Sequence, residues 1–428
     1  MLGRTHNPMC NRSLAGGTAL GITKEWQAGE LARGYGYVGE KYVCAACFED
    51  PAIKAFIDDL ADASVCSYCH REGVDGAAIA APIDEVISLV ARGLRTVYGH
   101  PNEEGLAYES AEGGWQGTVM HTADVLSEEV WLADSYGELF DDLLKSLIDY
   151  EWCQKNYGWL TAEDALRHGW DDFCNTVKYQ TRFFFHTIGE EKTGFRAPGE
   201  IRPGEMLDKL GDVVCEAKLL RPLRVGQLVY RARVHDRGQD VASAAQLGTA
   251  PIEADVPSNR MSAAGIPMFY GALDEQTPKT ETVDVKNDIG RAVSVGTFKV
   301  ASDLVVLDLS VLPRVPSIFD LSNTHVRPGI IFLHAFAHDV AKPIEKDGRE
   351  HIEYVPTQIV TEFFRQEFMT PEGTRIAGIL YRSSRNDGGT CCVLFASPEV
   401  IEDDNNEPPD ASTWLLLSKH TVSTEDLT

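Results

Sequence analysis

The stretch GIPMFYGALDEQTPKTE, residues 265–281, places a short β-rich run directly before a helix start. Its first part, Pro267–Ala272, predicts a strand that carries Tyr270, and Glu281 follows eleven residues after that tyrosine. A helix is predicted further on, over Pro356–Phe368. Similar β-rich runs, separated by Gly, Pro and Asp turns, are Gln227–Val234, Asp303–Leu309, Gly329–Phe332 and Thr390–Phe395. We therefore expect a mixed α+β domain over residues 206–428, with an acidic segment near its end.

The first half of the chain has the pattern of a helical domain. Two apolar stripes at helical spacing run from Leu139 to Ile148 and from Trp170 to Val177, and a Pro- and Gly-containing linker follows at 197–204. A further stripe after Pro82, a favourable helix start, consists of Ile83, Val86, Ile87, Val90, Leu94 and Val97. The sequence predicts an N-terminal arm and a small metal module over residues 1–75, then an α-helical domain over 76–205.

The metal module is predicted from two CxxC pairs, Cys44/Cys47 and Cys66/Cys69, separated by eighteen residues. Four thiolates at this spacing are typical of a structural Zn²⁺ site, because each CxxC turn offers two sulfurs to one tetrahedral ion. Two disulfides are the alternative, which a reducing cytosol disfavours. His70 follows Cys69 and is a less favoured substitute for one sulfur. We expect one zinc ion per chain on the four cysteines.

Charge excludes some classes of function. The 428 residues include 65 acidic and 39 basic side chains, a formal charge of −26, which argues against non-specific nucleic-acid binding and against docking on anionic membranes. Residues 1–10 lack the apolar core of a signal peptide and no apolar run is long enough to span a bilayer, so a soluble cytoplasmic protein is expected. Residues 221–397 hold 21 acidic and 19 basic side chains, and this nearly neutral part is better suited to an anionic ligand.

Four side chains of the second half stand in a fixed order: Arg231, Tyr270, Glu281 and Ser383. Taken singly, each has an ordinary structural interpretation. A strand arginine is usually a surface charge, and an acid near a helix start usually complements the helix dipole. A tyrosine in an apolar strand is usually a core residue, and a serine in a turn is usually a turn residue. Their joint order and spacing is what indicates a site.

This order resembles the RES domain, a family named for an arginine, a glutamate and a serine. The resemblance covers residues 220–420 and rests on a strand arginine, a G-x-P-x-x-Y-x-A strand, a Thr-x3-Glu helix start and a Y-x-S-x-R turn. RES domains are NAD-degrading toxins with a fold similar to ADP-ribosyltransferases. The resemblance implies that the active-site residues are Arg231, Tyr270, Glu281 and Ser383.

Two departures from the family pattern concern the substrate pocket. Met261-Ser262 follows Asn259-Arg260 where the family usually has an aromatic residue and an asparagine, and Arg382 stands in the turn where proline is frequent. The first half resembles the companion HEPN/RES N-terminal domain, which has a zinc-binding start and a helical body.

The implied reaction is cleavage of the nicotinamide–ribose bond of NAD⁺. Nicotinamide is already cationic in the substrate, so it departs as a neutral molecule without a general acid while positive charge gathers on the ribose. Glu281 would stabilise that charge, and Arg231 would bind a phosphate, with Arg260 as a second candidate. Tyr270 would stack on the nicotinamide ring. Ser383 would position a hydroxyl or amide, since no histidine base is evident beside it.

Other functions stay open at this point. ADP-ribosyl transfer to a macromolecule would use the same pocket with an acceptor in place of water. A HEPN-type ribonuclease would use Arg95 and His100, although their place at a helix end before Pro101 favours a cap and a turn. A zinc-stabilised binding module with a degenerate second half is a further alternative. His334 and His338 are interpreted as structural, because no metal-site glutamate motif accompanies them.

The resemblance also implies regulation. A free NAD-degrading toxin would harm its host, so an inhibited state is expected, imposed by the helical half, by an antitoxin or by self-assembly into a homo-oligomer. A role in toxin–antitoxin or anti-phage systems is implied by the family alone.

Overall fold

The computed structural model describes residues 34–134, 137–147, 151–187, 198–342 and 348–428. Residues 1–33, in the predicted N-terminal arm, and Ile148, at the end of the apolar stripe that starts at Leu139, lie outside these ranges. The chain forms two compact units: unit 1 comprises the described residues up to Gly158 together with Pro316–Thr324, and unit 2 comprises the rest. The units therefore divide at residue 158, ahead of the predicted linker at 197–204.

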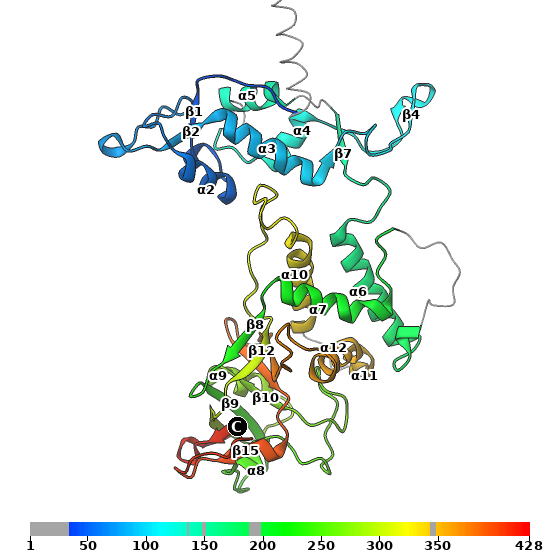
Figure 1. The fold of residues 1–428 in the computed structure, drawn as a ribbon. Helices are drawn as coiled ribbons and strands as arrows, with labels where there is room; N and C mark the ends of the chain where they lie inside the picture. Colours follow the sequence, from blue (N-terminus) through cyan, green and yellow to red (C-terminus); the bar gives the residue numbers. More distant parts are fainter. Residues whose placement is uncertain (1–33, 135–136, 148–150, 188–197, 343–347) are drawn as a thin grey trace, which may run out of the picture. The chain divides into compact units, whose positions relative to one another are not determined.

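Unit 1 combines helices with short strands (Figure 1). Its helices are α2 (Pro51–Leu60), α3 (Ile83–Val97), α4 (Thr122–Glu129) and α5 (Glu138–Ser146). Its strand pairs are β1 (Tyr42–Cys44) with β2 (Ala80–Pro82), β3 (Tyr98–Gly99) and β6 (Met120–His121) with β7 (Glu151–Gln154), and β4 (Tyr108–Glu109) with β5 (Gly114–Trp115). The prediction of an all-helical domain after residue 76 is wrong in this respect.

Local sequence explains where the helices of unit 1 begin. Asp50 caps α2, because its Oδ1 accepts hydrogen bonds from the backbone N–H groups of Ala52 (2.8 Å) and Ile53 (3.0 Å), and Pro51 occupies the first helical position. The helix predicted after Pro82 is confirmed as α3. Its buried face joins Val43, Cys47 and Ile57 in a single core, so the cysteine segment and the helical segment are one folded body rather than two.

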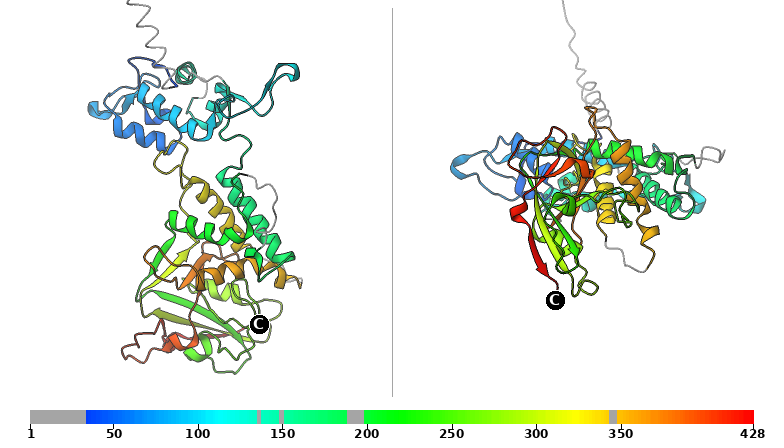
Figure 2. Two further views of the ribbon diagram at one scale, coloured as in Figure 1. Left: turned by 45° about the vertical axis from the view of Figure 1, so that its right-hand side comes forward. Right: turned by 90° about the horizontal axis from the view of Figure 1, so that it is seen from below.

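Unit 2 contains a curled sheet (Figure 2). Its strands follow the order β15-β16-β11-β9-β10-β14-β13-β12-β8, with β17 beside β11. Most neighbours are antiparallel, whereas β12–β13 and β15–β16 are parallel. The strands are β8 (Leu220–Leu223), β9 (Leu228–His235), β10 (Phe269–Ala272), β11 (Ala292–Val300), β12 (Leu304–Asp308), β13 (Gly378–Arg382), β14 (Thr390–Leu394), β15 (Ile401–Asp403), β16 (Leu415–Leu417) and β17 (Ser423–Asp426).

The helices of unit 2 cover mainly one face of this sheet. They are α6 (Ala162–Tyr179), α7 (Met206–Glu216), α8 (Ala244–Leu247), α9 (Gln276–Thr282), α10 (Arg327–Ala341), α11 (Glu350–Glu353) and α12 (Val355–Gln366). Side chains of α6, α7, α10 and α12 pack with Ile379 and Val393, and we call this the helix face. The alternate strand positions, Leu380 and Leu394, pack with α8 on the opposite face, the α8 face.

The structure corrects two predictions in unit 2. Gly329–Phe332 was expected as a strand but lies in helix α10, where the buried residues Gly329, Leu333, Phe336 and Val340 follow helical spacing. The apolar stripe from Trp170 to Val177 forms part of α6, and it packs in unit 2 instead of at the end of the predicted N-terminal helical domain. Among the described residues, no helix combines the length and the apolar character that crossing a membrane requires.

Candidate functional site

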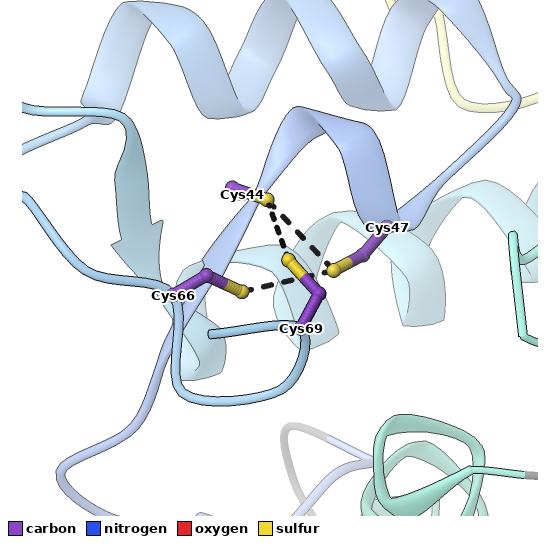
Figure 3. A group of neighbouring side chains, drawn as sticks. All are labelled: Cys44, Cys47, Cys66 and Cys69. Carbon is purple, nitrogen blue, oxygen red and sulfur yellow. Dashed lines mark hydrogen bonds between the residues drawn. The ribbon is translucent and has the colours of Figure 1, made fainter. Parts of the chain in front are cut away.

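The four cysteines of the two CxxC pairs lie together in unit 1 (Figure 3). Cys44 is the last residue of β1 and Cys47 ends the 3₁₀ turn that follows, whereas Cys66 and Cys69 come from the loop ahead of β2. The Sγ–Sγ distances are 3.9 Å for Cys44–Cys47, 3.4 Å for Cys44–Cys69 and 3.7 Å for Cys47–Cys66. All four sulfurs lie within 4.8 Å of one another, and none forms a disulfide.

These distances suit a tetrahedral metal ion. Sulfurs about 2.3 Å from a central Zn²⁺ would lie about 3.8 Å apart, close to the spacing found here. Burial raises the pKa of the Cys44 thiol to about 11, and a hydrogen bond with Cys66, together with burial, raises that of Cys47. The same hydrogen bond lowers the pKa of Cys66 to about 4, so a proton is shared unequally within this buried pair. A divalent cation would displace those protons and neutralise the repulsion between thiolates. Within the described part of the chain, no other group of His, Cys, Asp and Glu offers such a set of ligands.

A polar cavity of about 390 Å³ lies in unit 2, on the helix face beside α9. Three predicted site residues, Arg260, Tyr270 and Glu281, line it. The other lining residues are Asn259, Gly271, Pro278, Thr282, Tyr354, Tyr381, Ser384, Arg385 and Cys391. The volume falls in the range of about 300–1,000 Å³ that is usual for small-molecule sites.

The carboxylate of Glu281 is held from one side of the cavity. The Ser383 hydroxyl donates to its Oε1 at 2.5 Å, and the backbone N–H of Ser384 donates to the same oxygen at 3.2 Å. The Ser383 Oγ in turn accepts from the backbone N–H groups of Arg385 (3.1 Å) and Asn386 (2.9 Å). Ser383 thus has its hydrogen-bonding capacity filled by these groups and orients the Glu281 carboxylate.

The Asn259-Arg260 turn is fastened to α12. The Gln358 side-chain amide donates to the carbonyl oxygens of Asn259 (2.7 Å) and Ser262 (3.1 Å), and the Thr357 hydroxyl donates to the Arg260 carbonyl at 2.6 Å. The Arg260 guanidinium donates to the carbonyl of Val340 at 2.8 Å. The sequence after Asn259 departs from the family pattern, yet Arg260 still reaches the cavity.

Aromatic side chains form further walls of the cavity. The Tyr270 hydroxyl pairs with Ser262 Oγ at 2.9 Å, and burial raises its pKa to about 12. Burial also raises the pKa of Tyr381 well above its usual value. Both phenols are therefore neutral over the physiological pH range, and they serve as hydrogen-bonding and stacking groups rather than as bases.

Cys391 lies beside the Glu281 carboxylate and the Ser383 hydroxyl. Burial, together with the negative charge of Glu281, raises the pKa of this thiol to about 12. The neighbouring Cys392 lies on the α8 face, since successive strand residues point to opposite sides of the sheet. At neutral pH Cys391 is a neutral thiol in the cavity wall.

Arg231 is not brought to the cavity wall. Its guanidinium carbon lies 4.9 Å from the centre of the Phe269 ring, and Phe269 belongs to the core of the α8 face, whereas the adjacent Tyr270 packs on the helix face. Arg231 thus lies across the sheet from the other predicted residues. Its Nη1 is buried without a hydrogen-bond partner, and burial, with the nearby charge of Arg233, lowers its pKa to about 10. A buried guanidinium with an orphaned donor is suited to an anion.

Several cavity residues were not identified from the sequence. Tyr354 comes from the turn between α11 and α12, and no local pattern marks it as functional. No local pattern marks Cys391 either, since its nearness to Glu281 depends on the pairing of β14 with β13. Arg385 belongs to the Y-x-S-x-R turn, and that motif was the signal that would have identified it.

The histidines considered in the sequence, His334, His338 and His100, are absent from the lining of the cavity. In α10, His334 is exposed and its Nε2 pairs with the Pro313 carbonyl at 2.9 Å, and His338 is also exposed. Arg95 lies in the last turn of α3, and the His100 Nδ1 accepts from the Asn102 backbone N–H at 3.2 Å in the turn that follows. The cap and turn predicted there agree with this geometry.

Unit 2 is thus a mixed α/β domain whose polar cavity is built on a strand, a short helix and a turn. Comparison with protein-family models identifies this class: the RES domain matches residues 228–416, and HEPN/RES N-terminal domain 1 matches residues 60–191. The chain is a RES-domain protein with a HEPN/RES N-terminal domain. The RES family is associated with enzymes that act on NAD. Neither a curated protein nor a solved structure matches the chain.

The N-terminal match bears on the cysteine cluster and on the units. It begins at residue 60, so Cys66 and Cys69 lie inside it, whereas Cys44 and Cys47 precede it. It also runs past residue 158, so it takes in α6, which packs in unit 2. The family boundary and the compact units therefore divide the chain differently.

Proposed function

We propose that the protein cleaves the nicotinamide–ribose bond of NAD⁺, with water as the acceptor. The observation that carries the proposal is the Glu281 carboxylate, fixed by Ser383 and Ser384 at the wall of a cavity that also presents two arginines and three tyrosines. A fixed anion is what an oxocarbenium-like ribose needs, because charge develops there as neutral nicotinamide leaves. We further propose that the domain shares the ADP-ribosyltransferase fold, on the family likeness.

The cavity residues divide the work by their chemistry. Glu281 stabilises the positive charge on the ribose and can bind its hydroxyls or orient the water. Tyr270 offers an aromatic face for the nicotinamide ring. Arg260 and Arg385 line the cavity and can pair with the two phosphates. Ser383 acts through Glu281, whose rotamer it fixes.

Arg231 has a different part in this proposal. Its buried charge lies across the sheet from Tyr270 and adds to the positive potential under the cavity, which favours an anionic ligand. Its orphaned Nη1 supports a role in holding a phosphate, provided that the ligand reaches past Gly271. We propose Arg231 as a binding residue that acts on ligand affinity, with Arg260 as the direct contact.

For the cysteine cluster we propose Zn²⁺, held by Cys44, Cys47, Cys66 and Cys69. The metal would supply a rigid cross-link between the turn after β1 and the loop ahead of β2, with no part in the reaction of unit 2. On the family likeness alone, we propose that the protein acts as a toxin in toxin–antitoxin or anti-phage systems. It would be held in the cytoplasm in an inhibited or oligomeric form.

The test is direct. Purified protein is incubated with NAD⁺, and free nicotinamide and ADP-ribose are measured by liquid chromatography. Glu281→Gln keeps the shape of the side chain and removes its charge, so turnover should fall by about 10²–10⁴-fold. The matched control is Glu275→Gln, an exposed acid at the opposite end of the same helix, which should retain wild-type turnover.

The outcomes separate the alternatives. Nicotinamide release with an equal yield of ADP-ribose supports hydrolysis. Nicotinamide release with label from NAD⁺ appearing on protein or nucleic acid would replace hydrolysis by ADP-ribosyl transfer. No nicotinamide release, with or without cell extract, would refute both forms of the proposal.

A further inference from the structure

The helix that carries Glu281 is too short to hold its own position. Helix α9 has seven residues, Gln276–Thr282, and isolated helices of this length are unstable in water. Glu281 lies in its last turn. The carboxylate can therefore be placed accurately only if tertiary contacts fix the helix at both ends.

One such contact is the Ser383 bond to Glu281 at the C-terminal end. A second contact exists one helical turn earlier, at Thr277, which is fully buried and lies on the same side of the helix because it is four residues from Glu281. The Thr277 hydroxyl donates to Asp274 Oδ2 at 2.6 Å and accepts from Asn386 Nδ2 at 2.7 Å. The Thr277 backbone N–H donates to Asp274 Oδ1 at 2.8 Å.

Asn386, which donates to Thr277, belongs to the same turn that holds Glu281 through Ser383. The backbone N–H of Ser383 donates to the Gly389 carbonyl at 2.9 Å, and the N–H of Gly389 donates to the Asn386 carbonyl at 3.0 Å, which closes the turn 383–389. A Cβ at Gly389 would lie 2.2 Å from Thr277 Oγ1, so the turn approaches the helix as closely as its atoms allow. The turn and the helix are therefore joined at two points, one turn of helix apart.

We propose that Thr277, with Asp274 and Asn386, forms a clamp that sets the position of the Glu281 carboxylate. This inference rests on the proposed NAD⁺ cleavage and adds positioning residues to it. Asp274 fixes the direction of the Thr277 hydroxyl proton, and this leaves the oxygen free to accept from Asn386. Loss of the clamp lets the turn 383–389 shift against α9, and displacement of a catalytic group by about 1 Å is enough to reduce a rate by about 10²-fold.

The experiment compares Thr277→Val, which has the shape of threonine without its hydroxyl, with Thr277→Ser, which keeps the hydroxyl. Nicotinamide release from NAD⁺ is measured over a range of NAD⁺ concentrations. We expect Thr277→Val to lower kcat by about 10–100-fold with KM within about twofold, and Thr277→Ser to restore kcat to within about threefold of wild type. Asn386→Ala removes the same hydrogen bond from a partly exposed position, so this variant should fold and should lower kcat by a similar factor. It decides the test if Thr277→Val fails to fold.

A second readout needs no turnover. Hydrogen exchange of the peptide that spans residues 382–389, followed by mass spectrometry, should be faster in Thr277→Val and in Asn386→Ala and unchanged in Thr277→Ser. Equal exchange in wild type and both clamp-breaking variants, or full kcat in both, would overturn the clamp. Wild-type protein that releases no nicotinamide refutes the proposed function instead, and the exchange result then decides the clamp by itself.

Discussion

Replacement of Arg231 by methionine tests whether the buried guanidinium lowers the stability of the ligand-free protein. Burial lowers the pKa of Arg231 to about 10 from the usual value of arginine, which corresponds to roughly 3 kcal/mol lost by the charged form on folding. The cation–π contact with the Phe269 ring offsets about 0.5–2 kcal/mol of this cost. Methionine fills a similar volume without a charge, so Arg231→Met should stabilise ligand-free unit 2 by about 1–2 kcal/mol.

The sign of this effect at different pH values follows from the pKa. Below pH 10 Arg231 is charged in both the folded and the unfolded protein, so the full penalty is present at neutral pH. Above pH 10 the unfolded chain binds more protons than the folded one, and the penalty falls as the pH rises. The comparison therefore belongs at pH 7, where the expected difference is largest.

The assay is native-state hydrogen exchange of the β9 amides, because a chain with two compact units does not unfold in one step. The matched control is Arg233→Met in the same strand, since Arg233 is exposed and bonds to the Gln246 carbonyl. It should change the opening free energy by less than about 1 kcal/mol. An opening free energy lowered by more than about 1 kcal/mol in Arg231→Met would refute the reasoning. Higher stability combined with weaker NAD⁺ binding would show that the charge is retained for the ligand.

Three further predictions concern other parts of the chain. Freshly purified protein should contain one zinc per chain by elemental analysis, and Cys47→Ser should lose the metal and unfold unit 1 in circular dichroism; a metal-free wild type would exclude the site. The Cys391 pKa of about 12 leaves about one thiol in 10⁴ ionised at pH 8. Iodoacetamide should therefore modify Cys391 at least about 10³-fold more slowly than a free thiol, and the rate should rise about tenfold per pH unit up to pH 12. Rapid labelling of Cys391 at pH 8 would contradict this prediction. Gly389→Ala should displace the turn from Thr277 and lower nicotinamide release about as much as Thr277→Val does, and retained release would count against the close approach.

Much of the site could be predicted because its parts are coded locally. The two CxxC pairs each form a tight turn, so their spacing alone brings four sulfurs together. Glu281 and Tyr270 belong to one strand–helix segment, and this segment forms as β10 and α9. Ser383 is distant in sequence, and the family resemblance rather than any local pattern placed it with Glu281.

Other features depend on long-range packing that local patterns do not reveal. The predicted grouping of Arg231 with Tyr270 required the two side chains to share a face of the sheet. Strands β9 and β10 pair at one position, Ala272 with Tyr230, so Tyr230 shares the face of Ala272 and Tyr270. The next residue, Arg231, therefore points to the opposite face. The longest of the described strands, β11, is not predicted from the sequence, because Gly296 interrupts its β-branched pattern. That glycine is required by packing, since a Cβ there would lie 2.9 Å from both Leu247 and Leu417. Helix α6 was assigned to the first half because apolar spacing shows that a face is buried, not what it is buried against.

The segment Pro316–Thr324 has a consequence for synthesis on the ribosome. It belongs to unit 1, where Ile318 and Phe319 enter the core, although it lies in the chain between β12 and α10 of unit 2. The N-terminal unit therefore cannot complete its core until residue 324 has emerged from the exit tunnel. Ser383 emerges 383 − 324 = 59 residues later, about 3–12 s at ordinary elongation rates. During this interval a nascent chain already has a finished first unit but lacks the turn that holds Glu281, so any factor that recognises unit 1 can bind before the site is assembled.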